Sequence, residues 1–124
     1  MLRVGDPLPN HGQAVIESRK LVEFVFSPTN DVGRHHARVF RSALGYDRAT
    51  SMQFRREIIS KLAAATVSKV GGKPEFPTFE VKLPLKGPNG KTKMVVTAWF
   101  IEDDGRPRLV TAYVEDPQPP EYAD

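Results

Sequence analysis

The sequence contains no cysteine and no long apolar run. Without cysteine the chain has no disulfides, no thiolate ligands for zinc or iron–sulfur clusters, and no cysteine nucleophile. No apolar stretch approaches the roughly 18 residues that a membrane-spanning helix needs, and the N-terminus lacks the apolar core of a signal peptide. We therefore expect a soluble, cytoplasmic protein with no membrane partner.

The motifs of several enzyme classes are also absent. The chain has no P-loop, no GxGxxG fingerprint, no HExxH zinc motif and no GxSxG nucleophile elbow. The glycines of KGPNGK at 86–91 lack the strand-to-helix context that cradles a phosphate. Asp103 and Asp104 precede Gly105, a pattern typical of a hairpin turn and not of a metal site. We expect neither a metal nor a cofactor.

What is present fits one folded domain. The chain has 124 residues, of which 40% are hydrophobic and 27% are charged, as in an ordinary globular domain. Prolines and glycines near the two ends predict a flexible N-terminal tail at 1–12 and a proline-rich C-terminal tail at 117–124. The expected domain spans 13–116.

Positive charge is concentrated in the first part of the chain. Residues 1–73 contain 12 Lys and Arg against 6 Asp and Glu, a net charge of +6, whereas residues 74–124 contain 6 against 9, a net charge of −3. A concentrated basic region attracts polyanions, although a solvated helix surface has the same composition. Both interpretations stay open at this point.

Helical periodicity dominates the basic part. Apolar spacing predicts a helix over 33–44, ended by Gly45. A face apart from its apolar stripe carries three arginines: Arg34, Arg38 and Arg41. His35 borders this arginine face, whereas His36 lies beside the apolar stripe. The preceding segment 18–27 fits a short helix, and its LVEFVF run also fits a strand.

A second helix is predicted over 50–65. Thr50 and Gln53 fit a capping box at its start. Apolar residues recur along one face of this helix, and Arg55 and Arg56 add positive charge on the exposed side.

After residue 65 the apolar period changes from 3.6 to 2, which predicts strands. The expected strands are 66–70, 79–85, 92–101 and 108–115, the first ended by Gly71 and Gly72. Pro84 favours an edge position for its strand, whereas 92–101 is apolar on both faces and therefore central. The predicted fold is α+β: two or three N-terminal helices packed on a three- to four-stranded antiparallel meander sheet.

Two segments carry a family resemblance. They read KLVEFVFSPTNDVGRHHARVFRSALGY and VTAWFIEDDGRPRLVTAY. Their GRxxARxF helix, W-x-I strand and terminal LVTAY resemble a family of small bacterial proteins of unknown function. Members of that family occur alone or at the ends of larger toxin-like and phage-related proteins. The resemblance covers most of 15–114 and implies a toxin-like effector, which would be delivered or secreted if it belongs to a larger toxin system.

The order of helices and strands is also similar to that of the RelE, barnase, colicin and EndoU ribonucleases. This weaker, fold-level resemblance implies RNA cleavage by attack of the 2′-hydroxyl group. Such cleavage without a metal needs a base for the 2′-OH proton, an acid for the 5′ leaving oxygen, and cations for the phosphate.

The residue types suited to this chemistry are few. We expect catalytic roles for His35, Arg38, Thr111 and Tyr113, and nucleic-acid-binding roles for Arg34, Arg41, Arg55 and Arg56. The alternatives are a surface histidine, a solvated arginine face, and hydroxyl side chains that only pack in the sheet. Trp99 fits either the core or a stacking site for a base.

Two functional hypotheses follow. The first is a toxin-like effector that acts as a metal-independent endoribonuclease on tRNA or mRNA and is neutralised by a small acidic antitoxin or immunity protein. The alternative is a non-enzymatic immunity or antitoxin-like module that binds a cognate protein.

Overall fold

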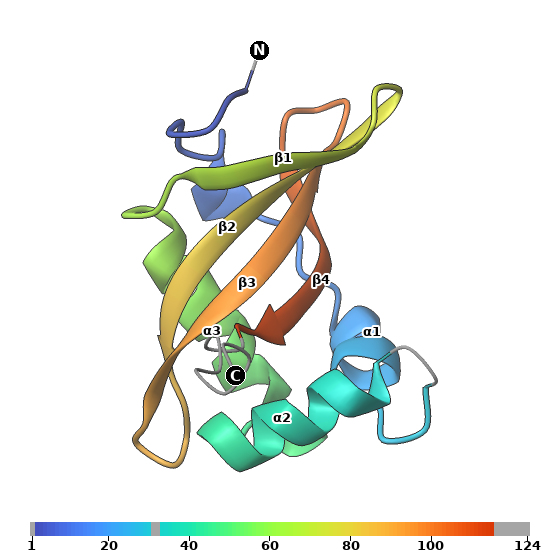
Figure 1. Cartoon of the computed structure of the whole chain (residues 1–124), viewed down its shortest axis with the longest axis vertical. Helices are drawn as coiled ribbons and strands as arrows, with labels where there is room; N and C mark the ends of the chain where they lie inside the picture. The colour runs from blue at the N-terminus through green and yellow to red at the C-terminus, as the bar shows by residue number, and fades with distance from the viewer. Residues whose placement is uncertain (1, 31–32, 116–124) are drawn as a thin grey trace, which may run out of the picture.

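The computed structural model describes residues 2–30 and 33–115 (Figure 1). Within them, three N-terminal helices precede a four-stranded antiparallel meander in the order β1-β2-β3-β4. The helices are α1 (Ser18–Lys20), which continues as a π-helical segment (Leu21–Val25), α2 (Arg34–Leu44) and α3 (Ser51–Leu62). The strands are β1 (Val67–Lys73), β2 (Phe76–Lys86), β3 (Thr92–Ile101) and β4 (Pro107–Val114). The α+β prediction is confirmed, and the LVEFVF run is helical.

The strand order corrects two details of the sequence prediction. β1 continues through Gly71 and Gly72 to Lys73, because its pairing with β2 extends to Phe76. β2 is an inner strand, so its predicted edge position is wrong. The pairing between β1 and β2 stops at Val67 and Val81, however, so Pro84 lies beyond it and its missing N–H removes no bond to β1.

The core lies between α3 and one face of the sheet. The apolar stripe predicted for α3 is buried, with Phe54, Ile58 and Leu62 facing the strands. Trp99 on β3 is fully buried, so the core position is confirmed and this indole has no surface on which a base stacks. The Trp99 Nε1–H donates to the Thr97 hydroxyl (2.7 Å), which donates to the Val81 carbonyl (2.7 Å). This chain of bonds satisfies the buried polar groups of the sheet centre.

An aromatic cluster joins α2 to the rest of the core. The Phe26 ring packs edge-on against Phe40 of α2 (5.4 Å between centroids) and Phe54 of α3 (4.9 Å), and Tyr46 packs against Phe54 (5.1 Å). Edge-to-face contacts of this kind contribute about 0.5–1.5 kcal/mol each beyond burial. The cluster therefore fixes α2 against the start of α3.

The turn between β2 and β3 fixes the C-terminal end of α2. Gly45 ends the helix with φ +83°, as its sequence position predicts. The Asn89 backbone N–H donates to the Leu44 carbonyl (3.2 Å), and the Asn89 side-chain amide donates to the Ala43 carbonyl (3.3 Å). Gly87 allows this approach, since a Cβ there would lie 2.0 Å from the Leu44 oxygen.

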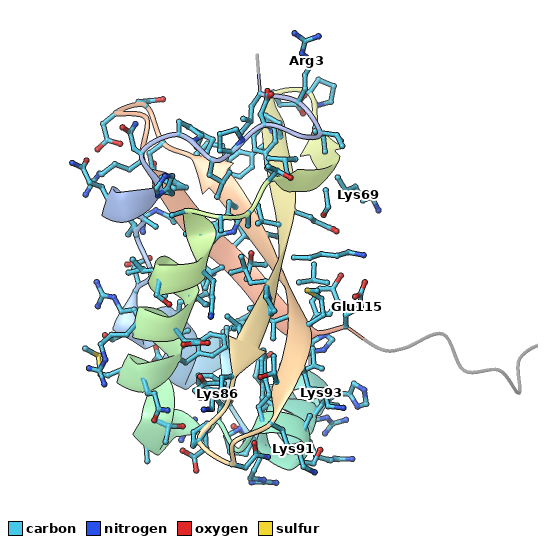
Figure 2. All side chains as sticks on the ribbon, turned by 90° about the vertical axis from the view of Figure 1, so that its left-hand side faces the viewer. Arg3, Lys69, Lys86, Lys91, Lys93 and Glu115 are labelled. Atoms are coloured by element: carbon cyan, nitrogen blue, oxygen red, sulfur yellow. The ribbon has the colours of Figure 1, made fainter. Side chains whose placement is uncertain are left out.

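The second face of the sheet is the open one. Figure 2 shows α3 on one side of the sheet, with the side chains of Lys69 and Glu115 on the opposite side. Lys82 of β2, Val96 of β3 and Tyr113 of β4 are successive partners across the three strands. They form one row on this open face, at the end of the sheet where α2 contacts β4.

The N-terminal segment packs onto the domain. The Gly5 N–H donates to the Val67 carbonyl (2.9 Å), the Val67 N–H donates to the Asp6 carbonyl (2.8 Å), and Leu8 is buried in the core. A single apolar residue among prolines gives little sequence signal for this packing. The proline-rich tail predicted for 117–124 lies outside the described residues.

Candidate functional site

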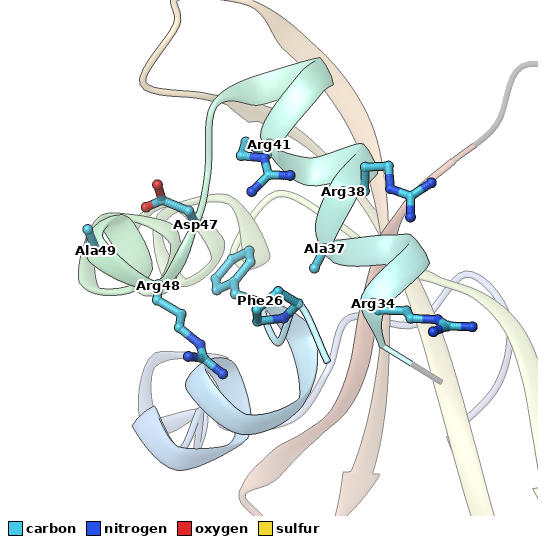
Figure 3. Close-up of a pocket in the computed structure, with 9 residues that line it drawn as sticks. Phe26, Arg34, Ala37, Arg38, Arg41, Asp47, Arg48 and Ala49 are labelled. Atoms are coloured by element: carbon cyan, nitrogen blue, oxygen red, sulfur yellow. The ribbon is translucent and has the colours of Figure 1, made fainter. Parts of the chain in front are cut away.

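A cavity of about 400 Å³ opens between α2 and the segment that leads into α3 (Figure 3). Four arginines line it: Arg34, Arg38, Arg41 and Arg48. The Phe26 ring and the Ala37 methyl group contribute an apolar part of the wall, and Asp47 is the only acidic residue among the described residues that line it. Figure 3 shows Arg41 and Arg48 reaching toward the cavity from opposite sides, whereas the guanidinium groups of Arg34 and Arg38 point away from its centre.

Local structure explains how these arginines come together. The three on α2 recur one turn apart, so the helix places them on one flank, as the sequence predicts. Arg48 belongs to a short 3₁₀ turn (Arg48–Thr50) that a capping box between Asp47 and Thr50 holds. The predicted box between Thr50 and Gln53 is therefore wrong, because the Thr50 hydroxyl accepts from the Asp47 N–H (2.8 Å). The Arg48 Nε–H donates to the Val22 carbonyl (3.0 Å), which orients its guanidinium.

The cavity has an excess of positive charge. The Asp47 carboxylate accepts bonds from the Thr50 N–H (3.2 Å) and hydroxyl (3.2 Å). Within the described residues none of the four cavity arginines forms an ion pair, whereas Arg19, Arg106 and Arg108 each do. The cavity arginines are exposed, and four guanidinium groups share a single carboxylate among the described lining residues.

Unpaired arginines around a cavity suit an anionic ligand. A guanidinium group presents a planar set of donors that matches phosphate oxygens, and it remains charged at any physiological pH. The Phe26 ring and Ala37 add an apolar surface beside these donors. The arrangement can bind a phosphate-bearing molecule with both charge and apolar contact.

His36 lies on the flank of α2 opposite the arginines, and His35 lies between the two flanks. The His36 ring stacks on Tyr113 of β4, with 5.1 Å between centroids and 30° between planes. His35 is exposed, and its ring contacts His36 edge-on (5.8 Å). Thr111 occupies the same open face as Tyr113, since they pair with Ala98 and Val96, two residues apart on β3. The structure thus joins Tyr113 to His36, places Thr111 on the same face of β4 as Tyr113, and brings the His35 ring against His36.

Charged neighbours surround the Tyr113 phenol. Burial raises the pKa of Tyr113 above its ordinary value, the negative charges of Glu80 and Glu115 raise it further, and the positive charge of Lys82 lowers it. The Lys82 ammonium is bound to the Glu115 carboxylate (2.5 Å). Tyr113 therefore stays protonated at neutral pH and can donate a proton or a hydrogen bond.

Comparison with known proteins identifies the family. The family model described as a domain of unknown function (DUF6883) matches residues 7–116. The chain belongs to the DUF6883 family. A comparison with curated protein sequences finds no match. The predicted resemblance to a family of unknown function is thereby confirmed.

A solved structure shares the fold of this DUF6883 domain. It is a chain of the contact-dependent growth inhibition toxin–immunity protein complex from Klebsiella pneumoniae 342, with a TM-score of 0.66 and 14% sequence identity. The match covers 82% of the DUF6883 chain and all of the other chain. At this identity the likeness shows a common fold.

The remaining predicted residues lie apart from the cavity of the DUF6883 domain. Arg55 is half-buried and Arg56 exposed on α3, and neither lines the cavity. The described residues contain no group of three or more His, Asp or Glu side chains that could hold a metal ion. None of the described helices has the length and apolar character needed to cross a membrane.

Two features of the site have little sequence signal. Arg48 joins the α2 arginines because of the Asp47–Thr50 box, and only the D-x-x-T spacing hints at that turn. The contact between His36 and Tyr113 joins a helix to the last strand, and the apolar pattern indicates only that His36 lies beside the buried stripe.

Proposed function

We propose that this DUF6883 chain is a toxin-like effector domain that binds RNA through the arginine cavity and cleaves it without a metal ion. The observation that carries the proposal is the group of four arginines around one cavity, exposed and without an ion-pair partner among the described residues. Natural surfaces commonly pair such charges, so an uncompensated group favours an anionic ligand.

The arrangement of the arginines favours a polymer over a small anion. Arg34, Arg38 and Arg41 follow the length of α2, so they can contact successive phosphates of one strand. Arg48 and Phe26 extend the surface across the cavity, where a ribose or base can lie. The fold shared with a chain of a toxin–immunity complex is compatible with a toxin-like role and equally with that of the immunity protein.

The cleavage reaction requires proton transfer and also stabilisation of the negative charge that develops on the phosphate. The arginines would hold the scissile phosphate and stabilise the charge that develops when the 2′-oxygen attacks phosphorus. We assign this role to Arg38, which lies near the middle of the α2 row. Arg34, Arg41 and Arg48 would position the neighbouring phosphates.

The test is RNA cleavage by the full chain in EDTA. We expect the wild-type protein to cleave tRNA or total RNA, and Arg38→Ala to reduce the rate about 100-fold or more, because a charge aimed at the transition state is lost. Arg106→Ala is the matched control: it removes the same charge from the turn between β3 and β4, where Arg106 is bound to Asp104.

Equal rates for Arg38→Ala and wild type would contradict the assignment of the cavity. If the protein neither binds nor cleaves RNA at any protein excess, that result favours the non-enzymatic alternative, in which the chain binds a cognate protein.

A further inference from the structure

The two edges of the sheet differ in how they are covered. At β4, Val15 forms a bridge with Arg108: the Val15 N–H donates to the Pro107 carbonyl (2.7 Å), and the Val15 carbonyl accepts from the Leu109 N–H (2.9 Å). Helix α2 contacts the same strand. At β1, which Figure 1 shows along the other edge, the N-terminal segment bonds only to Val67. Among the described residues, no other backbone group bonds to the outer side of β1.

The open part of the β1 edge is the stretch 68–73, in which every residue is exposed or half-buried. Its pairing with β2 is regular from Lys69 to Lys73, after a bulge beside Ser68, and the positive φ of Gly72 (+76°) twists the strand near its end. An edge strand presents alternate N–H and C=O groups away from its neighbour. This stretch can therefore pair with one further short strand.

Three of the five large apolar side chains that are exposed among the described residues lie around this edge. Val70 belongs to β1 and is 45% exposed, and Val4 precedes Gly5, whose N–H bonds to the start of β1. Phe76 begins β2 after the hairpin turn, and its ring stacks on Phe100 (4.2 Å between centroids). Apolar side chains gathered beside an unpaired strand edge favour a protein as the partner.

The alternation of side chains along β1 specifies the chemistry of that partner. Lys69 and Lys73 pair with Glu80 and Phe76 on the open face of the sheet, whereas Val70 lies on the face that carries the core. Among the described residues, neither lysine forms an ion pair. A strand added beside β1 follows the same alternation, so its acidic side chains would meet the lysines and its apolar side chains would meet Val70.

We propose that the open edge of β1 binds an extended segment of a partner protein, in which acidic and apolar residues alternate, by strand addition. A second copy of this chain fits the edge poorly, because antiparallel pairing of two β1 strands brings the lysines of both copies together on one face. The inference is independent of the proposed function, since β1 contributes no residue to the arginine cavity.

The probe for this edge is a synthetic seven-residue peptide in which glutamate and valine alternate, titrated into the ¹⁵N-labelled full chain. We expect saturable shifts of the amide signals of residues 68–73 and slower hydrogen exchange at alternate amides of this stretch, because new backbone bonds form there. A peptide of the same composition with its glutamates in one block should bind about tenfold more weakly, since it cannot match the alternation of β1.

Charge reversal tests the contribution of the two lysines. The double variant Lys69→Glu with Lys73→Glu should raise the Kd of the glutamate peptide about tenfold and should bind a peptide with lysine in place of glutamate more tightly than wild type does. The matched control is Lys91→Glu with Lys93→Glu, which Figure 2 shows at the other end of the sheet from Lys69. It should leave both Kd values unchanged. Thermal unfolding checks each fold, and Lys69→Glu alone serves if the double variant unfolds.

Four results would overturn the inference. They are an absence of shifts at residues 68–73 at millimolar peptide, equal Kd values for the alternating and block peptides, equal losses in the two double variants, and a dimer of the free chain in which the β1 amides are protected. Protection of these amides by a 2′-O-methyl RNA, which cannot react, and not by the peptide would assign the edge to nucleic acid and also overturn it. Cleavage of RNA is tested separately by the cavity variants.

Discussion

At the scale of single residues, buried polar groups in this chain are placed so that each has a partner. No buried side-chain nitrogen or oxygen among the described residues lacks a hydrogen bond. Tyr46 illustrates the principle: its side chain is fully buried in the aromatic cluster, and its hydroxyl donates to the Lys86 carbonyl (2.5 Å). The tyrosine thereby joins the end of α2 to the end of β2.

This environment predicts a loss of stability at alkaline pH. Burial, with a smaller effect of the Glu57 charge, raises the pKa of Tyr46 from 10.0 to about 12. Because the fold favours the neutral phenol, the stabilisation that Tyr46 gives the folded state is complete below about pH 10 and is lost as the pH rises toward 12. In Tyr46→Phe, the free energy of unfolding should therefore fall less between pH 10 and 12 than in wild type, as measured by urea denaturation.

The same variant should be less stable at neutral pH. It leaves the Lys86 carbonyl without its donor, which costs about 1 kcal/mol. Tyr113→Phe is the comparison, because the pKa of the Tyr113 phenol is also raised. This variant should still lose most of the stability that the wild type loses at alkaline pH, because the pKa of Tyr46 is shifted further. An unchanged alkaline slope in Tyr46→Phe would show that another group causes it.

At the scale of elements, α2 carries most of the arginines on which the proposed function depends, and its position depends on a glycine in a turn. A Cβ at residue 87 would lie 2.0 Å from the Leu44 carbonyl oxygen and 2.6 Å from the Leu44 Cβ. The turn between β2 and β3 can therefore bind the end of α2 only if this residue has no side chain.

Gly87→Ala should destabilise the protein by about 1–3 kcal/mol, the usual cost of overpacking, because the turn or α2 must move. Urea denaturation of the variant measures this change. The control is Gly12→Ala, since a Cβ there meets no atom within 4 Å and should leave the midpoint unchanged. A Gly87→Ala protein as stable as wild type would mean that the contact with Leu44 is not a fixed part of the fold.

The elements also show what the sequence can and cannot predict. Helix α2, its end at Gly45 and its arginine flank follow from local periodicity, and so does β3 as an inner strand. The edge position of β2 was predicted wrongly, because Pro84 reports only its own surroundings and not the length of β1. A periodic pattern assigns faces, but pairing partners and strand ends depend on tertiary contacts.

The same distinction between local sequence pattern and tertiary contact applies to the candidate site. The row of α2 arginines is predictable from spacing along one helix, whereas Arg48 enters the cavity through a turn and a bond to the Val22 carbonyl. The stack of His36 on Tyr113 brings together residues from α2 and β4. Sequence spacing holds no information on such a contact.

At the scale of the whole molecule, the basic first part of the chain and the acidic second part meet along α2. The helical part carries the unpaired arginines, while the sheet contributes carboxylates such as Glu80 and Glu115 on its open face. A polyanion is attracted to the first surface, whereas on the second the Glu115 carboxylate is paired with the Lys82 ammonium. On the proposed function, this charge distribution favours contact between RNA and the arginines of α2.

The salt dependence of RNA binding tests this picture. Each phosphate contact with single-stranded nucleic acid contributes about −0.7 to the slope of log K against log salt, because bound counterions are released. Four cavity arginines therefore predict a slope of about −3 for a 2′-O-methyl RNA, measured by filter binding between 50 and 200 mM salt. Arg41→Ala should reduce the slope by about 0.7, since it removes one such contact.

Arg106→Ala should bind with the wild-type slope, although it changes the net charge by the same amount, because Arg106 is bound to Asp104 in the turn between β3 and β4. Equal reductions in the two variants would indicate attraction by net charge alone. A reduction confined to Arg41→Ala requires direct contact between the cavity and phosphate, since counterion release depends on which charges touch the strand and not on how many the protein carries.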